Sequence, residues 1–236
     1  VLKGWDWNRA YAELTLHFRK GVKWSDGQPF CAEHFMFFWN DMVLDKDVGL
    51  SFPSGTVVNE KPMTVEKLDD QTIKLTFDAP NPLFIDFASR GHYQSAQWLV
   101  PAHYMKNYHP KYSKVTDTKD LMARYNTASR TQQIGMPTLN AWMAVAYTAG
   151  QRLVTKRNPY YWKVDTKGQQ LPYVDGIETT LATSDSFKQA VLLNWLVSGN
   201  ESTGFNPAVA VDSNGQVTRG KAPSSFAFTP YDTVNY

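Results

Sequence analysis

The amino-acid sequence predicts a mixed fold of helices and strands, in the α+β or mixed α/β class. In residues 13–19 apolar side chains alternate with polar ones, which is the period of a half-buried strand. In residues 32–43 the apolar side chains are spaced by three and four, which indicates an amphipathic helix. Later strand and helix patterns do not alternate strictly, so a purely parallel sheet with crossover helices is not expected.

The first elements should be a strand, a turn and a helix. Leu14, Leu16 and Phe18 are expected to face the core and His17 the solvent, because the side chains of a strand point alternately to its two faces. The Asp-Gly pair at 26–27 supplies the positive φ angle that a tight turn needs. The buried face of the helix is expected to contain Ala32, Phe35, Met36, Trp39, Met42 and Val43.

Hairpins and short helices are expected after this helix. Residues 65–77 should form a hairpin that turns at an Asp-Asp pair, whose side chains can bond their own backbone. Residues 142–157 should form another, with Trp142, Val145 and Leu153 on its buried face. Similar patterns predict a third hairpin at 209–217, with an Asn-Gly turn, and short helical segments at 83–88, 101–108, 121–125 and 187–196.

Length and composition exclude several classes of protein. A chain of 236 residues and 26.8 kDa can bury a substantial core, which excludes a disordered or fibrous protein. Lysine and arginine number 24 against 22 aspartate and glutamate, and without a basic block no nucleic-acid partner is expected. The longest apolar runs, 141–147 and 190–197, are far shorter than the roughly 20 residues that span a bilayer. The single cysteine, Cys31, excludes an internal disulfide.

Sequence motifs that would announce a catalytic mechanism, a phosphate-binding loop or a zinc-binding helix do not occur. No catalytic residue, metal or cofactor is therefore expected. Aromatic residues make up 14 % of the chain, which suits a surface that binds sugars or peptides. The candidate ligand-binding residues are His92, Tyr93, Gln97 and Trp98, which combine flat rings with hydrogen-bonding groups, and Trp142 is an outlying candidate. Equally, Tyr93 and Trp98 could anchor a long loop to the core.

The two most specific segments are residues 14–35 and 150–177. The first contains a strand, the sequence R-K-G-V-K-W, a D-G-x-P-F turn and a helix. The second contains R-N-P-x-Y-W followed by L-P-Y-x-D. In this order and spacing they resemble the family 5 extracellular solute-binding proteins, the oligopeptide and dipeptide receptors of ABC importers. The resemblance covers roughly residues 4–182.

This resemblance implies a lobe of the periplasmic-binding-protein kind (type II, cluster C). Because such receptors are two-lobed clamps of about twice this length, it also implies that the lobe is incomplete. The implied organisation has sheet segments of a first lobe at 1–30 and 136–183. An inserted helical and hairpin subdomain is expected at 31–135, and residues 184–236 form an unassigned tail.

The resemblance further implies the substrate-binding component of an ABC importer, which captures an oligopeptide or oligosaccharide non-covalently and delivers it to a membrane permease. An insertion at 164–169 and the aromatic content favour an oligosaccharide. The protein is expected to be a monomer in the periplasm or outside the cell, with a membrane anchor left open. One alternative is a carbohydrate-active enzyme or its accessory domain, which needs two carboxylates across a sugar cleft. The other is a stand-alone structural or interaction lobe.

Overall fold

The computed structural model describes residues 1–89, 98–126, 133–180, 209–211 and 217–219. The chain divides into two units, Val1–Leu181 and Ala182–Tyr236. In the second unit β10 (Val209–Val211) pairs antiparallel with β11 (Val217–Arg219), which confirms the predicted hairpin at 209–217. The helix predicted at 187–196 lies outside the described residues.

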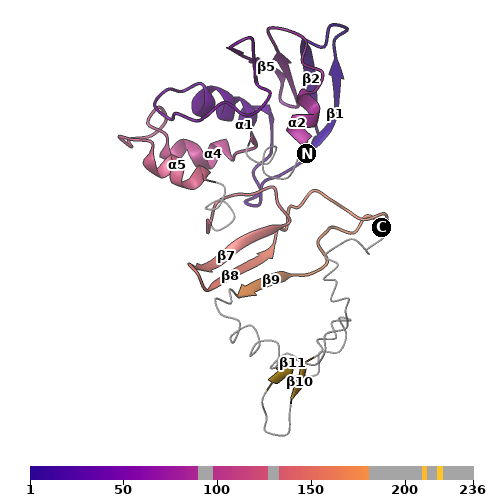
Figure 1. The fold of residues 1–236 in the computed structure, drawn as a ribbon, viewed down its shortest axis with the longest axis vertical. Coiled ribbons are helices and arrows are strands. Elements are labelled where there is room, and N and C mark those ends of the chain that lie inside the picture. Colours follow the sequence, from indigo (N-terminus) through magenta and orange to yellow (C-terminus); the bar gives the residue numbers. More distant parts are fainter. Residues whose placement is uncertain (90–97, 127–132, 181–208, 212–216, 220–236) are drawn as a thin grey trace. The chain divides into compact units, whose positions relative to one another are not determined.

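The first unit contains a four-stranded antiparallel sheet in the order β1-β2-β6-β5 (Figure 1). Its strands are β1 (Leu2–Trp7), β2 (Glu13–Phe18), β5 (Thr64–Asp69) and β6 (Thr72–Thr76). Every second residue of β2 is buried, as its alternation predicts, and His17 lies on the other face with its ring bonded to Asp6. The predicted Asp-Asp turn between β5 and β6 is confirmed, because the Asp69 carboxylate accepts a hydrogen bond from the backbone N–H of Gln71 at 2.6 Å.

The predicted long helix begins as α1 (Ala32–Phe37) and continues as the π-helix η1 (Phe38–Val43). A π-helix has a wider turn than an α-helix, so it shifts which side chains face the core. Phe38 and Asp41 of η1 are buried although the sequence pattern did not select them. In α1 the Phe37 ring is buried as well because it packs against His109 and Tyr112, whereas Met36, predicted on the buried face, is only half-buried. The other predicted core residues of this helix are confirmed as buried.

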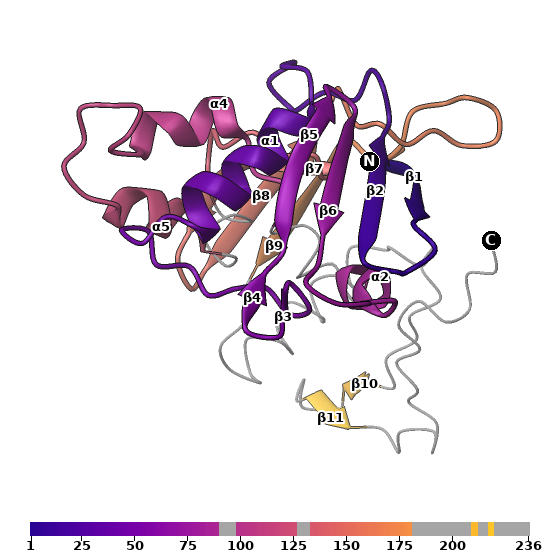
Figure 2. The ribbon, with the colours of Figure 1, turned by 90° about the horizontal axis from the view of Figure 1, so that it is seen from above.

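The remaining helices among the described residues of the first unit are short and lie close to their predicted positions. They are α2 (Phe84–Ser89), α4 (Ala102–Met105), η2 (Lys106–Tyr108) and α5 (Lys119–Tyr125). A two-residue hairpin, β3 (Val57–Val58) and β4 (Lys61–Pro62), turns through Asn59 and Glu60, both at positive φ. Figure 2 shows α1 between β5 and α4, both of which it contacts. The core lies between these helices and the four-stranded sheet. The largest fully buried side chains among the described residues are Trp24, Trp39, Phe30, Phe37, Phe38, Phe84, Leu14, Met42, Ile73, Leu75, Met105 and Leu121.

A second sheet has three antiparallel strands in the order β7-β8-β9. Its strands are β7 (Trp142–Thr148), β8 (Arg152–Arg157) and β9 (Gly176–Thr180). The predicted hairpin at 142–157 is thus confirmed, but no residue of the three strands is buried. Val145, predicted on the buried face, is 36 % exposed because it is the extra residue of a β-bulge between Ala144 and Ala146.

Strand pairing joins the first strands of the chain to a later segment. In the structure β2 pairs with β6, so the first strands of the chain share a sheet with the hairpin from the segment 31–135. Strands β7, β8 and β9 form a sheet of their own. The division into these segments and a tail at 184–236 remains a prediction.

Candidate functional site

Of the four clustered candidates, His92, Tyr93 and Gln97 lie outside the described residues. Trp98 is described and is only 5 % exposed. Its ring is stacked on Phe84, with the centroids 5.7 Å apart, and meets the edge of Phe35 at 6.2 Å. This packing favours the anchoring alternative for Trp98, because a ring with so little accessible surface offers no open face to a ligand.

Trp142, the fifth candidate, opens β7 and lies on one face of the second sheet. Residues that are paired across antiparallel strands share a face, and every second residue along a strand lies on that face. The pairs Trp142 with Arg157 and Tyr147 with Leu153 therefore place the two rings on the same side of the sheet. The residues of this face are Trp142, Ala144, Tyr147, Leu153, Thr155, Arg157, Ile177 and Thr179, and we call it the Trp142 face.

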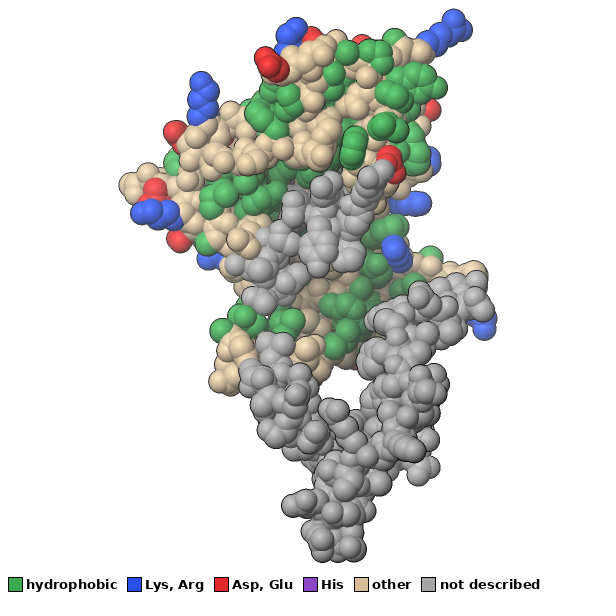
Figure 3. All heavy atoms as spheres, in the orientation of Figure 1, with side chains coloured by type: hydrophobic (Ala, Val, Ile, Leu, Met, Phe, Trp, Pro, Cys, Tyr) green, Lys and Arg blue, Asp and Glu red, His purple; other side chains and the backbone are tan. Residues whose placement is uncertain are grey.

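The Trp142 face combines apolar surface with polar groups. Trp142, Tyr147 and Leu153 are half-buried, whereas Ile177 is 43 % exposed. Figure 3 shows hydrophobic side chains gathered on the part of the first unit that carries this sheet. Flat rings next to hydroxyl groups are the combination that binds the apolar faces and hydroxyl edges of sugars. Among the described candidates, this face is therefore the surface best suited to a ligand.

The two motifs that carry the family resemblance contact each other. Ser25 of the first motif bonds to Thr138, which lies ahead of the second motif. The backbone N–H of Ser25 donates to the carbonyl of Thr138, and the N–H of Thr138 donates to the Ser25 hydroxyl, both at 3.0 Å. Gly27 has a φ of +87°, and a Cβ added there would meet the Tyr160 ring at 3.2 Å. Only glycine meets both demands, because it tolerates this φ and leaves room for the ring.

Asn158 of the second motif is fully buried and is satisfied by hydrogen bonds. Its side-chain amide donates to the carbonyls of Thr138 and Asn140, and its backbone N–H donates to Ala141. The side-chain oxygen accepts the backbone N–H of Tyr160. Asn158 therefore fixes the entry to β7 against the exit from β8, which positions the Trp142 face and leaves no polar atom of Asn158 for a ligand.

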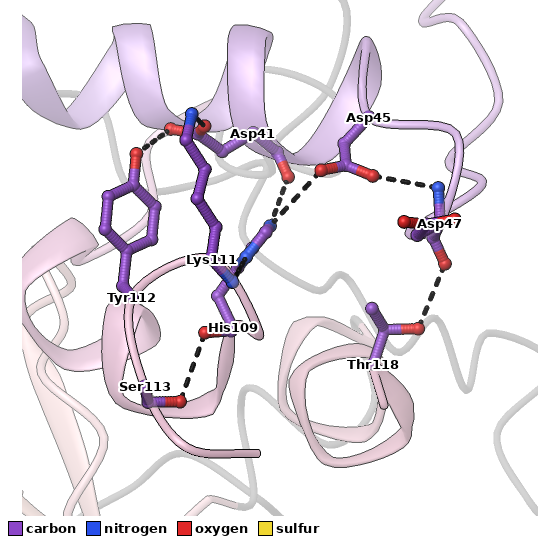
Figure 4. Close-up of polar contacts among 8 residues, drawn as sticks. All are labelled: Asp41, Asp45, Asp47, His109, Lys111, Tyr112, Ser113 and Thr118. Carbon is purple, nitrogen blue, oxygen red and sulfur yellow. Dashed lines mark hydrogen bonds and ion pairs between the residues drawn. The ribbon is translucent and has the colours of Figure 1, made fainter. Parts of the chain in front are cut away.

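A polar cluster around the buried Asp41 and His109 joins η1 to the segment that follows η2 (Figure 4). The carboxylate of Asp41, a residue 6 % exposed, accepts a hydrogen bond from the Tyr112 hydroxyl at 2.8 Å and forms an ion pair with Lys111. The backbone N–H of Lys111 donates to Nδ1 of His109, so Nε2 carries the proton and donates to the Asp41 carbonyl at 2.8 Å. Hydrogen bonding to Asp41 and the charge of its carboxylate raise the pKa of Lys111.

The sequence analysis missed this cluster because its members are 70 residues apart and show no motif. One signal was available, since an acidic residue at position 41 lies between the apolar Trp39 and Met42 of the predicted helix. A carboxylate at such a position needs a partner when the helix packs against a core. The cluster supports the structure, because its polar atoms bond to one another.

His34 lies in a second buried polar group. Its Nδ1 accepts a hydrogen bond from the backbone N–H of Ala102 at 3.0 Å, so Nε2 carries the proton and lies 3.2 Å from the carbonyl of Pro29 and 3.0 Å from the indole nitrogen of Trp24. Burial lowers the pKa of His34 to about 4, since the charged ring would lose hydration and the added proton on Nδ1 would face the N–H of Ala102. The neighbouring His103 bonds Asp26 at 2.7 Å, which ties α4 to the turn of the first motif.

Within the residues that the structure places, no three histidine, cysteine, aspartate or glutamate side chains gather as a metal site. Nor does any described helix have both the length and the apolar character needed to cross a bilayer.

The comparisons with known proteins agree with the two motifs. The family model "Bacterial extracellular solute-binding proteins, family 5 Middle" matches residues 1–226. A "Periplasmic alpha-galactoside-binding protein" of Rhizobium meliloti (strain 1021) is 35 % identical over 98 % of this chain and 32 % of its own length.

Solved structures of binding proteins also resemble this chain. The periplasmic binding protein MelB of Agrobacterium fabrum C58, in complex with stachyose, is 34 % identical with a TM-score of 0.63, over 82 % of this chain and 28 % of that chain. An "oligopeptide-binding protein OppA" is 32 % identical with a TM-score of 0.68, over 84 % of this chain and 31 % of that chain.

This chain spans about a third of the length of these relatives, and the fold that it shares with them is an incomplete lobe of a periplasmic binding protein, as expected. The family model covers more than half of the chain. The chain therefore belongs to the bacterial extracellular solute-binding proteins of family 5.

Proposed function

We propose that this chain is part of the substrate-binding component of an ABC importer and that its ligand is an oligosaccharide of the α-galactoside class. The observation that carries the proposal is the 35 % identity over 98 % of the chain with a protein described as binding α-galactosides. The 34 % identity with a protein crystallised with stachyose supports the same ligand class.

The Trp142 face offers a physical basis for this ligand class. Galactosides present an apolar ring face and a hydroxyl-rich edge, which match an indole or phenol ring and a nearby hydroxyl. Trp142 and Tyr147 supply the rings, and Thr155 on the paired strand supplies a hydroxyl. Trp142 is thus the proposed stacking residue, and His92, Tyr93 and Gln97 remain proposed contacts.

An oligopeptide is the second candidate ligand. It is favoured by the 32 % identity and the TM-score of 0.68 with an oligopeptide-binding protein. Peptide receptors hold an extended ligand through main-chain hydrogen bonds, as a strand is held at the edge of a sheet. Such a ligand depends less on aromatic side chains than a sugar does.

The wider setting also belongs to this proposal. A binding protein of this kind works in the periplasm or outside the cell, as a monomer that hands its ligand to a membrane permease without catalysing a reaction. A membrane anchor is compatible with this role.

The test is isothermal titration calorimetry with stachyose and with a tripeptide, using the protein expressed from its complete reading frame. We expect stachyose to bind and the tripeptide not to bind. Trp142→Ala should weaken stachyose binding at least about fivefold, since a ring lost from a ligand contact costs about 1 kcal/mol or more. Trp5→Ala, which removes a half-exposed tryptophan from the other sheet, is the matched control and should change the affinity less than about twofold.

The comparison of ligands tests the ligand class, and the comparison of variants tests the Trp142 face. Binding of the tripeptide alone would replace the sugar by the second candidate. Unchanged stachyose affinity in Trp142→Ala would keep the sugar and reject the Trp142 face. Absence of binding to both ligands would contradict the proposed ligand class.

A further inference from the structure

Four exposed cations gather where the two family motifs meet. Arg19 and Lys20 follow β2, Lys23 precedes the turn of the first motif, and Lys163 follows Trp162 within the second motif. We call this set the basic patch.

Aromatic rings of the second motif hold three of these cations in place. The guanidinium of Arg19 lies 5.7 Å from the centroid of the Trp162 ring, and the ammonium of Lys163 lies 5.3 Å from the same ring. The ammonium of Lys23 lies 5.5 Å from the Tyr160 ring. Cations over ring faces are attracted electrostatically, so these like charges stay close together instead of spreading into solvent.

Cations lie over rings at two other places among the described residues. Arg124 lies 5.6 Å from the Tyr104 ring and 3.9 Å from the Tyr108 ring, but it is a single cation that donates hydrogen bonds to Tyr104 and Gln133. Lys106 and Lys111 flank the Tyr112 ring at 4.8 and 5.3 Å, but they also form ion pairs with Glu33 and Asp41. No cation of the basic patch has a carboxylate within ion-pair distance in the part of the chain that the structure describes. Three of its four charges are therefore held in place by rings, and the charge of the patch is not balanced by a described carboxylate.

We propose that the basic patch is a docking surface for a partner protein that presents exposed carboxylates. Close like charges repel one another, and a partner's carboxylates placed between them relieve that repulsion as well as forming ion pairs. Charges held by rings lose less freedom on binding than free side chains do, which favours specific pairing.

A protein partner fits this surface better than a membrane. Stable binding to a lipid surface combines basic charge with apolar side chains that insert between the lipids. Here the two rings of the patch, Tyr160 and Trp162, already have cations over them. The inference does not depend on which ligand the protein binds.

The experiment measures binding of the protein to immobilised poly-L-glutamate by biolayer interferometry at low salt. The variant Arg19→Gln/Lys23→Gln/Lys163→Gln removes three charges from the patch. The matched control Lys46→Gln/Lys114→Gln/Lys167→Gln removes three exposed lysine charges that have no ion pair with a described carboxylate. We expect the patch variant to bind at least about fivefold more weakly and the control to change less than about twofold. Circular dichroism checks that each variant is folded. If the triple variant does not fold, Lys20→Gln/Lys163→Gln replaces it, because both residues lie outside the strands.

Two further readouts decide the class of partner. Carbodiimide coupling to poly-L-glutamate, mapped by mass spectrometry, should modify Lys20, Lys23 and Lys163 ahead of the control lysines. Vesicles of phosphatidylcholine and phosphatidylglycerol in equal parts should bind weakly and with no difference between the two variants. Equal loss of poly-L-glutamate binding in both triple variants would overturn the proposal, because net charge alone would then explain it. Vesicle binding that depends on the patch, without binding of poly-L-glutamate, would also overturn it in favour of a lipid surface.

Discussion

Removal of the exposed Lys111 should destabilise the protein more than neutralisation of the buried Asp41. In Lys111→Met the Asp41 carboxylate, with its side chain 9 % exposed, stays in place and keeps only the Tyr112 hydroxyl as a side-chain donor. In Asp41→Asn the amide oxygen still accepts that hydrogen bond, and no charge is left in the interior.

The magnitudes follow from what each change leaves behind. Breaking a buried ion pair by removing one partner costs about 3 to 5 kcal/mol, but Lys111 is 60 % exposed and water can take part of its place. We therefore expect Lys111→Met to lower the free energy of unfolding by about 2 kcal/mol. Asp41→Asn loses the charge-assisted part of its hydrogen bonds, about 1 kcal/mol. The double variant should resemble Asp41→Asn, which gives a coupling energy of about 2 kcal/mol.

Urea unfolding of the wild type and the three variants, followed by circular dichroism, completes the cycle. The control is Lys114→Met, which removes an exposed lysine without an ion pair to a described carboxylate and should change stability by less than about 0.5 kcal/mol. A smaller loss in Lys111→Met than in Asp41→Asn would refute the reasoning, as would single effects that add within about 0.5 kcal/mol.

Three further predictions concern the motif contact, the buried histidine and the packed tryptophan. Gly27→Ala should lower the free energy of unfolding by about 1 to 2 kcal/mol, because it strains a positive φ and presses on Tyr160; Gly135→Ala, at a similar φ with open space, should cost less in the same urea assay. His34 has a folded pKa of about 4, below its unfolded value of 6.5, so the unfolded state binds the extra proton. The free energy of unfolding should therefore fall by about 2 to 3 kcal/mol as the pH drops from 6.5 to 4. That loss should be absent in His34→Gln, and the same dependence of stability on pH in the wild type and the variant would contradict the prediction. Trp98→Ala should cost about 3 to 5 kcal/mol in thermal or urea unfolding, and normal stability with weakened stachyose binding would restore a direct ligand role for this ring.

Local patterns predicted the elements that bury one face. The strand at 13–18 and the helix from residue 32 each place apolar side chains at the period of their element, and both are found. Strand β9, with the sequence GIETT, was missed because all five residues are exposed and no burial imposes a pattern. The Asp41 cluster was missed because its partners are brought together only by tertiary packing.

The candidate site was harder to predict than the fold because the family motifs contribute to the scaffold. Ser25, Gly27, Asn158 and Tyr160 belong to the segments that carry the resemblance, and their described contacts are with one another, with residues 138–141 and with other residues of the two motifs such as Lys23. Such contacts fix where β7 begins, and therefore where the Trp142 face lies, without touching a ligand. The choice between a sugar and a peptide must then depend on side chains outside the motifs. A substitution at Gly27 should consequently lower stability while leaving the preference between stachyose and a tripeptide unchanged, whereas a substitution at Trp142 should change that preference while leaving stability nearly intact.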